Sequence, residues 1–285
     1  MICEKIDLYA YFQWERGGAK RGFLHSYRHE INAEMASKSR PAMLIFPGGG
    51  YEFVSLREWE SVVLCYFQEG FDAFVLEYDV APVGCYPAVL EQAGMAMLYL
   101  RREARHLSLR EDKIAAIGFS AGGHLAGCIS FLWDDPALMR RFGEECEKIK
   151  PDLCILSYPV VSADPQYCHS VSFDHFCAGM KDRSPYSLEN RVRSFAPPCF
   201  IWATSDDTCV LVENSIRLYS ALCRAGVPTE FHAFEHGVHG MSICNRDVTE
   251  HMSFETEHVA RWVDLSKEFL NAHDFIPVTL RQRSE

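Results

Sequence analysis

The chain has 285 residues, a formal net charge of −11 and 48% hydrophobic residues, which is typical of a globular enzyme built as one domain. The acidic residues are spread along the chain and no basic stripe occurs, so nucleic acid is not an expected partner. The N-terminus lacks an export signal and no apolar run is long enough to span a membrane, so we expect a cytoplasmic protein without a membrane partner.

The first half of the chain alternates apolar runs with helix-like stretches. Residues 5–14 and 22–31 resemble half-exposed strands, separated by a turn at 15–21. Continuous apolar runs, which indicate strands buried on both faces, occur at 42–46, 71–78 and 113–118. Helices are expected at 57–69, 87–106 and 121–132.

The second half continues the pattern, with strands expected at 153–158, 199–203 and 229–234 and helices at 212–225 and 255–270. This alternation predicts an α/β fold, with a mostly parallel twisted sheet of about eight strands and helices on both faces. The two N-terminal strands are expected to form an antiparallel edge.

Residues 162–197 interrupt the alternation of strands and helices, because they are rich in Asp, His, Ser and Pro and show no strong hydrophobic period. The segment lies between two predicted sheet strands, so it is either a short cap over a site or a surface excursion without a catalytic role. We expect one domain, 1–285, with 162–197 as the candidate cap.

Residues 118–122 (Gly-Phe-Ser-Ala-Gly) match the G-x-S-x-G pattern. A predicted buried strand precedes them and a helix of small residues follows, which is the setting of a nucleophile elbow. The alternatives are a plain glycine-rich turn or a phosphate loop, and the phosphate-loop motifs are absent here. We therefore predict Ser120 as a nucleophile.

A second glycine-rich loop, at 47–51 (Pro-Gly-Gly-Gly-Tyr), follows another buried strand. Acyl transfer places negative charge on a carbonyl oxygen, which needs fixed donors. Glycines let backbone N–H groups approach a substrate closely. We assign Gly49, Gly50 and Ala121 to an oxyanion hole, with a flexible turn as the alternative.

A serine nucleophile needs a histidine base held by a carboxylate. Both are available at strand ends further along the chain, in the order Ser, Asp, His that α/β-hydrolases use. Asp206 competes with Asp207, and His236 competes with His239, and spacing alone does not separate them. His124, on the helix after Ser120, suits packing or polarity near the site.

Together these residues resemble an α/β-hydrolase of the bacterial acetyl esterase and feruloyl esterase-like group, related to hormone-sensitive lipases. The resemblance covers about 41–270. It rests on the segments 47–51, 55–58, 78–87, 118–126, 197–202 and 236–240. The family pattern selects Asp207, through the D-x-x-V that ends at Val210, and His239, the second histidine of H-G-x-H-G. Pro47 stands where lipase-like relatives have histidine, which disfavours lipid substrates.

The resemblance implies a serine carboxylic ester hydrolase that works through an acyl-enzyme and needs no metal or organic cofactor. The expected substrates are small or carbohydrate esters, as for acetyl and acetylxylan esterases, with an oligosaccharide ester as the partner molecule. Tyr51, Arg57 and Glu58 are candidate contacts to a polar alcohol, with a structural role as the alternative. The oligomeric state stays open, a homodimer being one option.

Two other functions share parts of this pattern. A serine peptidase of the prolyl-oligopeptidase type has the same fold and G-x-S-x-G-G, although such enzymes usually carry a propeller, for which this chain has no room. A non-catalytic hydrolase-like receptor tends to lose one triad residue, and none is missing here.

The chain contains twelve cysteines, many of them inside apolar runs, as in 152–156. A chain of this length does not need disulfides to fold, and buried free thiols fit a reducing compartment. No C-x-x-C pair occurs, so a structural zinc site is not expected.

Overall fold

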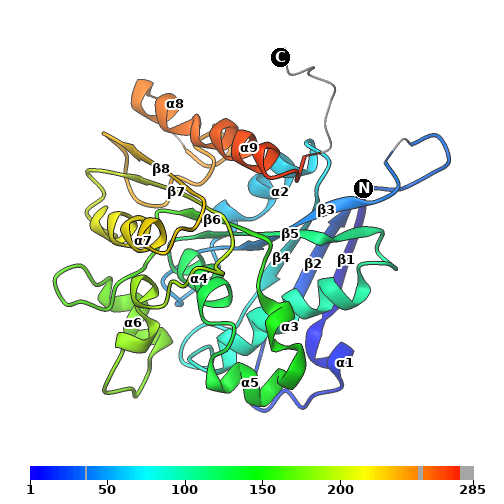
Figure 1. The fold of residues 1–285 in the computed structure, drawn as a ribbon, viewed down its shortest axis with the longest axis horizontal. Helices are drawn as coiled ribbons and strands as arrows, with labels where there is room; N and C mark the ends of the chain where they lie inside the picture. Colours follow the sequence, from blue (N-terminus) through cyan, green and yellow to red (C-terminus); the bar gives the residue numbers. More distant parts are fainter. Residues whose placement is uncertain (36, 250–252, 277–285) are drawn as a thin grey trace.

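The computed structural model describes residues 1–35, 37–249 and 253–276. Within these residues the strands form an eight-stranded sheet in the order β1-β2-β4-β3-β5-β6-β7-β8 (Figure 1). β1 pairs antiparallel with β2, and β2 antiparallel with β4, whereas the strands from β4 to β8 pair in parallel. The predicted fold class is confirmed, including the antiparallel edge.

The bounds of the elements follow the apolar runs closely. The strands are β1 (Ile2–Asp7), β2 (Phe23–Arg28), β3 (Arg40–Phe46), β4 (Asp72–Glu77), β5 (Leu109–Phe119), β6 (Leu153–Ser157), β7 (Cys199–Thr204) and β8 (Thr229–Phe234). The described helices are α1 (Leu8–Phe12), α2 (Glu60–Phe67), α3 (Ala88–Glu103), α4 (Ala121–Phe131), α5 (Pro136–Phe142), α6 (Ser170–Phe176), α7 (Glu213–Arg224), α8 (Phe254–Ala260) and α9 (Trp262–Ala272).

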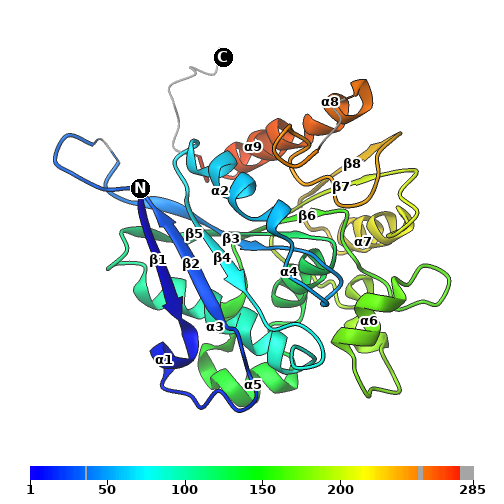
Figure 2. The same cartoon turned by 180° about the vertical axis from the view of Figure 1, so that it is seen from behind.

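Two helical layers cover the sheet, one on each face (Figures 1 and 2). The apolar run 42–46 of β3 is buried on both faces of the sheet. Leu44 and Phe46 pack into the core under α1, α3, α4, α5 and α7, whereas Met43 and Ile45 pack into the core under α2, α8 and α9. Side chains alternate between the faces of a strand, so a strand covered on both sides has no polar face.

Three segments differ from the prediction. Residues 8–12 form a helix rather than the continuation of a strand, because Asp7 accepts the N–H of Ala10 and caps the turn. The helix expected at 255–270 is divided into α8 and α9 at Arg261. α5 was not predicted, although Asp135 caps it and Pro136 occupies its first position.

The segment 162–197 contains α6 and two short 3-10 helices, Ser184–Tyr186 and Leu188–Asn190. It is anchored to the core rather than lying loosely on the surface, since Phe173, Phe176 and Leu188 are at most 1% exposed. α6 lies on the side of the molecule opposite the N-terminus (Figures 1 and 2).

All twelve cysteines are free thiols, and seven of them are buried. None of the helices within the described residues combines the length and the apolar character that crossing a membrane requires.

Candidate active site

Ser120 lies on a sharp turn between β5 and α4. Its φ of 53° is in the left-handed region, which non-glycine residues seldom adopt and which is common at functional sites. The two flanking glycines are required by close approach: a Cβ on Gly118 would lie 2.2 Å from the carbonyl oxygen of Gly122, and one on Gly122 would lie 2.1 Å from that of Phe46. The local geometry is that of the predicted elbow.

A chain of two hydrogen bonds leads away from the Ser120 hydroxyl. Oγ of Ser120 is 2.8 Å from Nε2 of His239, and Nδ1 of His239 is 2.7 Å from Oδ2 of Asp207. The other carboxylate oxygen of Asp207 accepts the N–H groups of Cys209 and Val210, at 2.8 and 3.0 Å. The buried carboxylate is therefore fixed in one orientation, which in turn fixes the imidazole.

The competing residues form a separate pair on the surface. Nδ1 of His236 is 3.1 Å from Oδ2 of Asp206, and both side chains are more than half exposed. This pairing raises the pKa of His236. The pKa of Asp206 is lowered first by the hydrogen bond that it accepts from the N–H of Gly237 and then by the pairing with His236. The structure thus brings Asp207 and His239, and not Asp206 and His236, to Ser120.

The glycine loop after β3 borders the same cavity. Gly49 and Gly50 line a pocket of about 520 Å³ together with Ser120 and His239. Within the described ranges, no protein acceptor takes the N–H groups of Gly49, Gly50 or Ala121. Gly48 is different, because its N–H donates to Glu58 at 2.6 Å and is occupied.

Two of the three candidate substrate contacts line this pocket. The exposed Arg57 donates to the carbonyl of Gly240 at 3.1 Å and stands at the pocket wall. Glu58 also borders the pocket but is only 3% exposed, and its two oxygens are taken by Gly48 N–H and by the Tyr158 hydroxyl at 2.7 Å. Its carboxylate is therefore bound by the protein itself.

The third candidate, Tyr51, is fully buried and does not line the pocket, so the expectation that it contacts a substrate is wrong. Its hydroxyl lies 2.8 Å from Nδ1 of His124, whose Nε2 lies 2.9 Å from the carbonyl oxygen of Tyr186. The carbonyl can only accept, so His124 carries its hydrogen on Nε2 and accepts the Tyr51 hydroxyl on Nδ1. Burial lowers the pKa of His124 to about 4.

No motif in the sequence indicates the residues that form the rest of the pocket wall. The candidate cap contributes His169 and Val171, and the loop after β7 contributes Cys209. Sγ of Cys209 is 3.5 Å from Nε2 of His169. Burial lowers the pKa of His169 and raises that of Cys209, so both are neutral at pH 7. The irregular polar composition of 162–197 was the available hint that this segment reaches the site.

Tyr158 was also missed. It follows β6, has a φ of 38°, and its ring stands edge-on to the ring of His239 with the centroids 5.0 Å apart. In the sequence, an aromatic residue at the end of a central strand is typical of the hydrophobic core. Tyr158 was therefore not identified as a residue near the site. Among the described residues, no group of three or more His, Cys, Asp or Glu side chains could hold a metal ion.

The chain is similar to known protein families and to solved structures. A family model described as BD-FAE matches residues 31–157, and a model of the Prolyl oligopeptidase family matches residues 161–266. The chain is similar to the crystal structure of an acetyl ester-xyloside bifunctional hydrolase from Caldicellulosiruptor lactoaceticus. The two are 33% identical, with 90% of this chain and 89% of that chain covered and a TM-score of 0.78.

Two curated relatives are much longer. Endo-1,4-beta-xylanase B of Butyrivibrio fibrisolvens is 33% identical over 78% of this chain and 35% of its own length. An acetylxylan esterase of Xylanibacter ruminicola is 30% identical over 70% of this chain and 40% of its own length. The chain therefore spans between a third and two fifths of these relatives.

The buried neutral His124 predicts a loss of stability in acid. The unfolded chain binds a proton at a pKa of about 6.5, whereas the folded protein does so only at about 4, so stability falls as the pH decreases from about 6.5 to about 4. We expect this residue to cost about 2 kcal/mol of unfolding free energy between pH 7 and pH 5.

Urea unfolding of the wild type and His124→Gln at both pH values measures this difference. The acid-dependent loss should shrink by about 2 kcal/mol in the variant. The exposed His106, changed to Gln, is the matched control and should leave the pH dependence unaltered. Equal pH dependence in wild type and His124→Gln would contradict the assignment.

Proposed function

The chain belongs to the α/β-hydrolase superfamily, in the esterase group related to the hormone-sensitive lipases, and on this basis we propose that it hydrolyses carboxylic esters with Ser120 as nucleophile. The observation that carries the proposal is the hydrogen-bonded chain from Ser120 through His239 to Asp207, opening into a pocket lined by Gly49 and Gly50.

In the proposed reaction, His239 accepts the Ser120 proton on Nε2 while Oγ attacks the ester carbonyl carbon. The carbonyl oxygen gains negative charge and is held by the N–H groups of Gly49, Gly50 and Ala121, which have no other acceptor in the described part of the protein. Asp207 accepts from Nδ1 and stabilises the imidazolium.

The tetrahedral intermediate then collapses. His239 gives its proton to the leaving alkoxide, so the alcohol departs and the acyl group stays on Oγ as an ester of Ser120. A water molecule, deprotonated by the same imidazole, attacks this acyl-enzyme and releases the carboxylic acid. The serine hydroxyl is restored with its proton, and every step uses groups of the chain itself.

We propose small acyl groups, chiefly acetyl, on a carbohydrate alcohol as the substrate class. Two relatives, an acetylxylan esterase and an acetyl ester-xyloside bifunctional hydrolase, support this choice. The pocket supports it as well, because the exposed Glu52 and Arg57 line it and offer an acceptor and donors to sugar hydroxyls. Reaction in the cytoplasm would require that such esters enter the cell as oligosaccharides.

A second candidate function is peptide hydrolysis, which the match of residues 161–266 to the Prolyl oligopeptidase family favours. That match spans the proposed acid and base, which esterases and peptidases share. It therefore supports the triad more than it supports an amide substrate.

Removal of the nucleophile tests the central assignment. Ser120→Ala should lower kcat on p-nitrophenyl acetate by roughly 10⁴- to 10⁶-fold, because it removes the oxygen that is hydrogen-bonded to Nε2 of His239. Wild type should react covalently with a fluorophosphonate at Ser120, seen as a mass increase on the peptide that contains it. Near-normal turnover in the variant would refute the mechanism.

Two neighbouring aspartates provide a matched pair for the orienting acid. Asp207→Asn should lower kcat by about 10⁴-fold, because an amide in that place favours the wrong imidazole tautomer. Asp206→Asn, which changes only the exposed contacts to His236 and to the N–H of Gly237, should stay within about threefold of wild type. Steady-state kinetics on the same ester measure both, and the reverse ranking would assign the acid to Asp206.

The alcohol specificity is tested with acetylated xylo-oligosaccharides, p-nitrophenyl acetate and octanoate, and a prolyl p-nitroanilide. We expect acetate release from the sugar esters with a kcat/KM at least equal to that for p-nitrophenyl acetate, despite the poorer leaving group, because the polar pocket rim contacts the sugar. Turnover of the anilide at a comparable kcat/KM would instead favour the peptidase.

A further inference from the structure

Glu58 is a buried carboxylate without an ionic partner. It is 3% exposed, and no lysine or arginine of the described chain forms an ion pair with it. The adjacent Arg57 donates to the carbonyl of Gly240 instead. Burial raises the pKa of Glu58, and hydrogen bonds from Tyr158 and Gly48 oppose that rise. Burying a carboxylate is costly unless its oxygens receive hydrogen bonds, and here the donors come from two different parts of the site.

One oxygen holds the loop of the proposed oxyanion hole. Oε2 of Glu58 accepts the N–H of Gly48 at 2.6 Å, immediately before Gly49 and Gly50. The same loop is held from its other side by the Tyr78 hydroxyl, which donates to the carbonyl of Pro47 at 2.5 Å. These contacts fix the Pro47–Gly48 peptide, which directly precedes the two peptides that carry the free N–H groups of Gly49 and Gly50.

The other oxygen reaches the loop that carries His239. The Tyr158 hydroxyl donates to Oε1 of Glu58 at 2.7 Å and accepts the N–H of Ser242 at 2.9 Å, three residues after His239. Oγ of Ser242 donates back to the carbonyl oxygen of Arg57 at 2.8 Å. The turn at 56–58 is therefore bound to the histidine loop by both side chain and backbone.

The donor pattern requires two hydrogen-bond acceptors at residue 58. Gly48 N–H can only donate, and the Tyr158 hydroxyl must donate to residue 58 because its other partner, Ser242 N–H, is itself a donor. Both atoms of residue 58 must therefore accept. An ionised carboxylate satisfies this requirement, whereas a glutamine of the same shape would point its NH₂ group at a donor.

We infer that Glu58 is a positioning residue, which holds the oxyanion loop and the histidine loop in register by accepting one hydrogen bond from each side. The inference rests on the proposed ester hydrolysis. Glu58 does not contact the reacting atoms. It acts through Gly48 on the oxyanion donors and through Tyr158 and Ser242 on the placement of His239.

Glu58→Gln tests the inference, since it keeps the shape and reverses the hydrogen-bonding character of one atom. We expect kcat on p-nitrophenyl acetate to fall by about 10- to 100-fold, because small displacements of catalytic groups have effects of that size, while KM changes by less than about threefold. The inhibition constant of a trifluoromethyl ketone, which forms a tetrahedral adduct with an oxyanion, should rise in proportion to the loss of kcat/KM.

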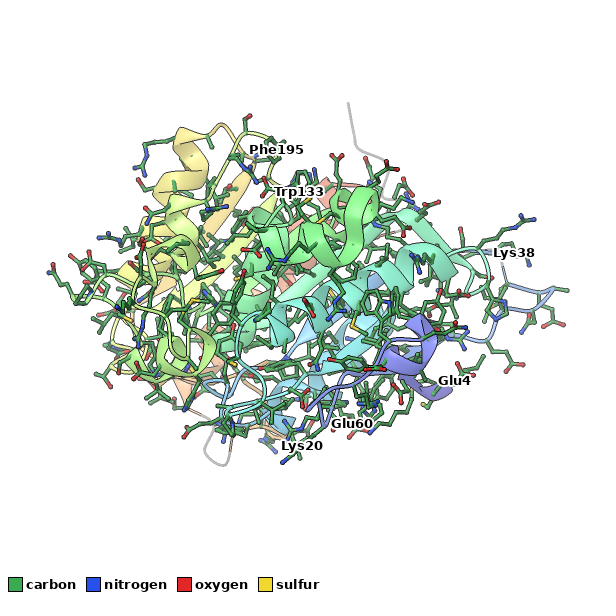
Figure 3. The ribbon with its side chains drawn as sticks, turned by 90° about the horizontal axis from the view of Figure 1, so that it is seen from below. Glu4, Lys20, Lys38, Glu60, Trp133 and Phe195 are labelled. Carbon is green, nitrogen blue, oxygen red and sulfur yellow. The ribbon has the colours of Figure 1, made fainter. Side chains whose placement is uncertain are left out.

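The control is Glu60→Gln, the same substitution two residues away. Glu60 is exposed and lies at the edge of the molecule (Figure 3), so kcat and inhibitor binding should stay at the wild-type level.

Tyr158→Phe removes the hydroxyl that links the two loops and should also lower kcat with little change in KM. Glu58→Gln should cost less in the Tyr158→Phe background than in wild type, because its NH₂ group no longer faces a donor.

The readouts separate positioning from mere stability. A Glu58→Gln protein with wild-type kcat and inhibitor affinity would overturn the inference, even if its melting temperature were lower. If Glu58→Gln does not fold, wild-type kinetics in Tyr158→Phe overturn it instead. Wild-type protein that neither hydrolyses esters nor reacts with fluorophosphonate would overturn the proposed function, and the inference with it. An active wild type matched by both variants would overturn the inference alone.

Discussion

The hydrogen-bonded register between β3 and β5 places Phe46 opposite Gly118, and the candidate site depends on that pairing. Parallel neighbours end at the same edge of the sheet, so the glycine loop after β3 and the elbow after β5 begin side by side. The fit leaves no room for a Cβ at Gly122, which packs against the carbonyls of Phe46 and Pro47. The spacing between the proposed nucleophile and the proposed oxyanion donors is thus a property of the sheet rather than of flexible loops.

Two buried carboxylates serve this arrangement, and they are held in different ways. Asp207 receives two backbone N–H groups on one oxygen and presents the other to His239. Glu58 gives both oxygens to the protein, one to each loop. The strands β5, β6 and β7 lie next to one another, so Tyr158 at the end of β6 stands between the elbow and the acid loop. From this place its hydroxyl donates to Glu58 and accepts the N–H of Ser242 in the histidine loop.

The central strands could be predicted from the sequence because burial on both faces leaves a continuous apolar run, as at 42–46. The elbow and the glycine loop could also be found, since steric crowding allows few residue types there. Short elements were harder to predict from the sequence. Residues 8–12 were expected to form a strand, because five residues are too few to show a helical period. The capping residue Asp7 was the one indication of a helix there. The boundary at Arg261 has no breaker residue to mark it.

Within the site, spacing alone left Asp206 and Asp207 equivalent, as it did His236 and His239. Resemblance chose one of each, and the structure shows the physical difference, since one pair is buried beside Ser120 and the other is exposed. Tyr51 and Glu58 looked like substrate contacts because they follow the glycine loop. Nothing in a linear sequence reveals that His124 and Tyr158, 73 and 100 positions away, occupy their polar atoms.

The path from Tyr51 through His124 to the carbonyl of Tyr186 ties the glycine loop to the segment 162–197 across helix α4. The glycine loop and the segment 162–197 are thus not independent modules. A chimera that received the equivalent segment of another hydrolase would have to supply a carbonyl at the place of Tyr186 or lose His124 as well. Segment exchange in this scaffold is therefore constrained by one imidazole hydrogen, and co-inheritance of Tyr51 and His124 is the pattern to look for in its relatives.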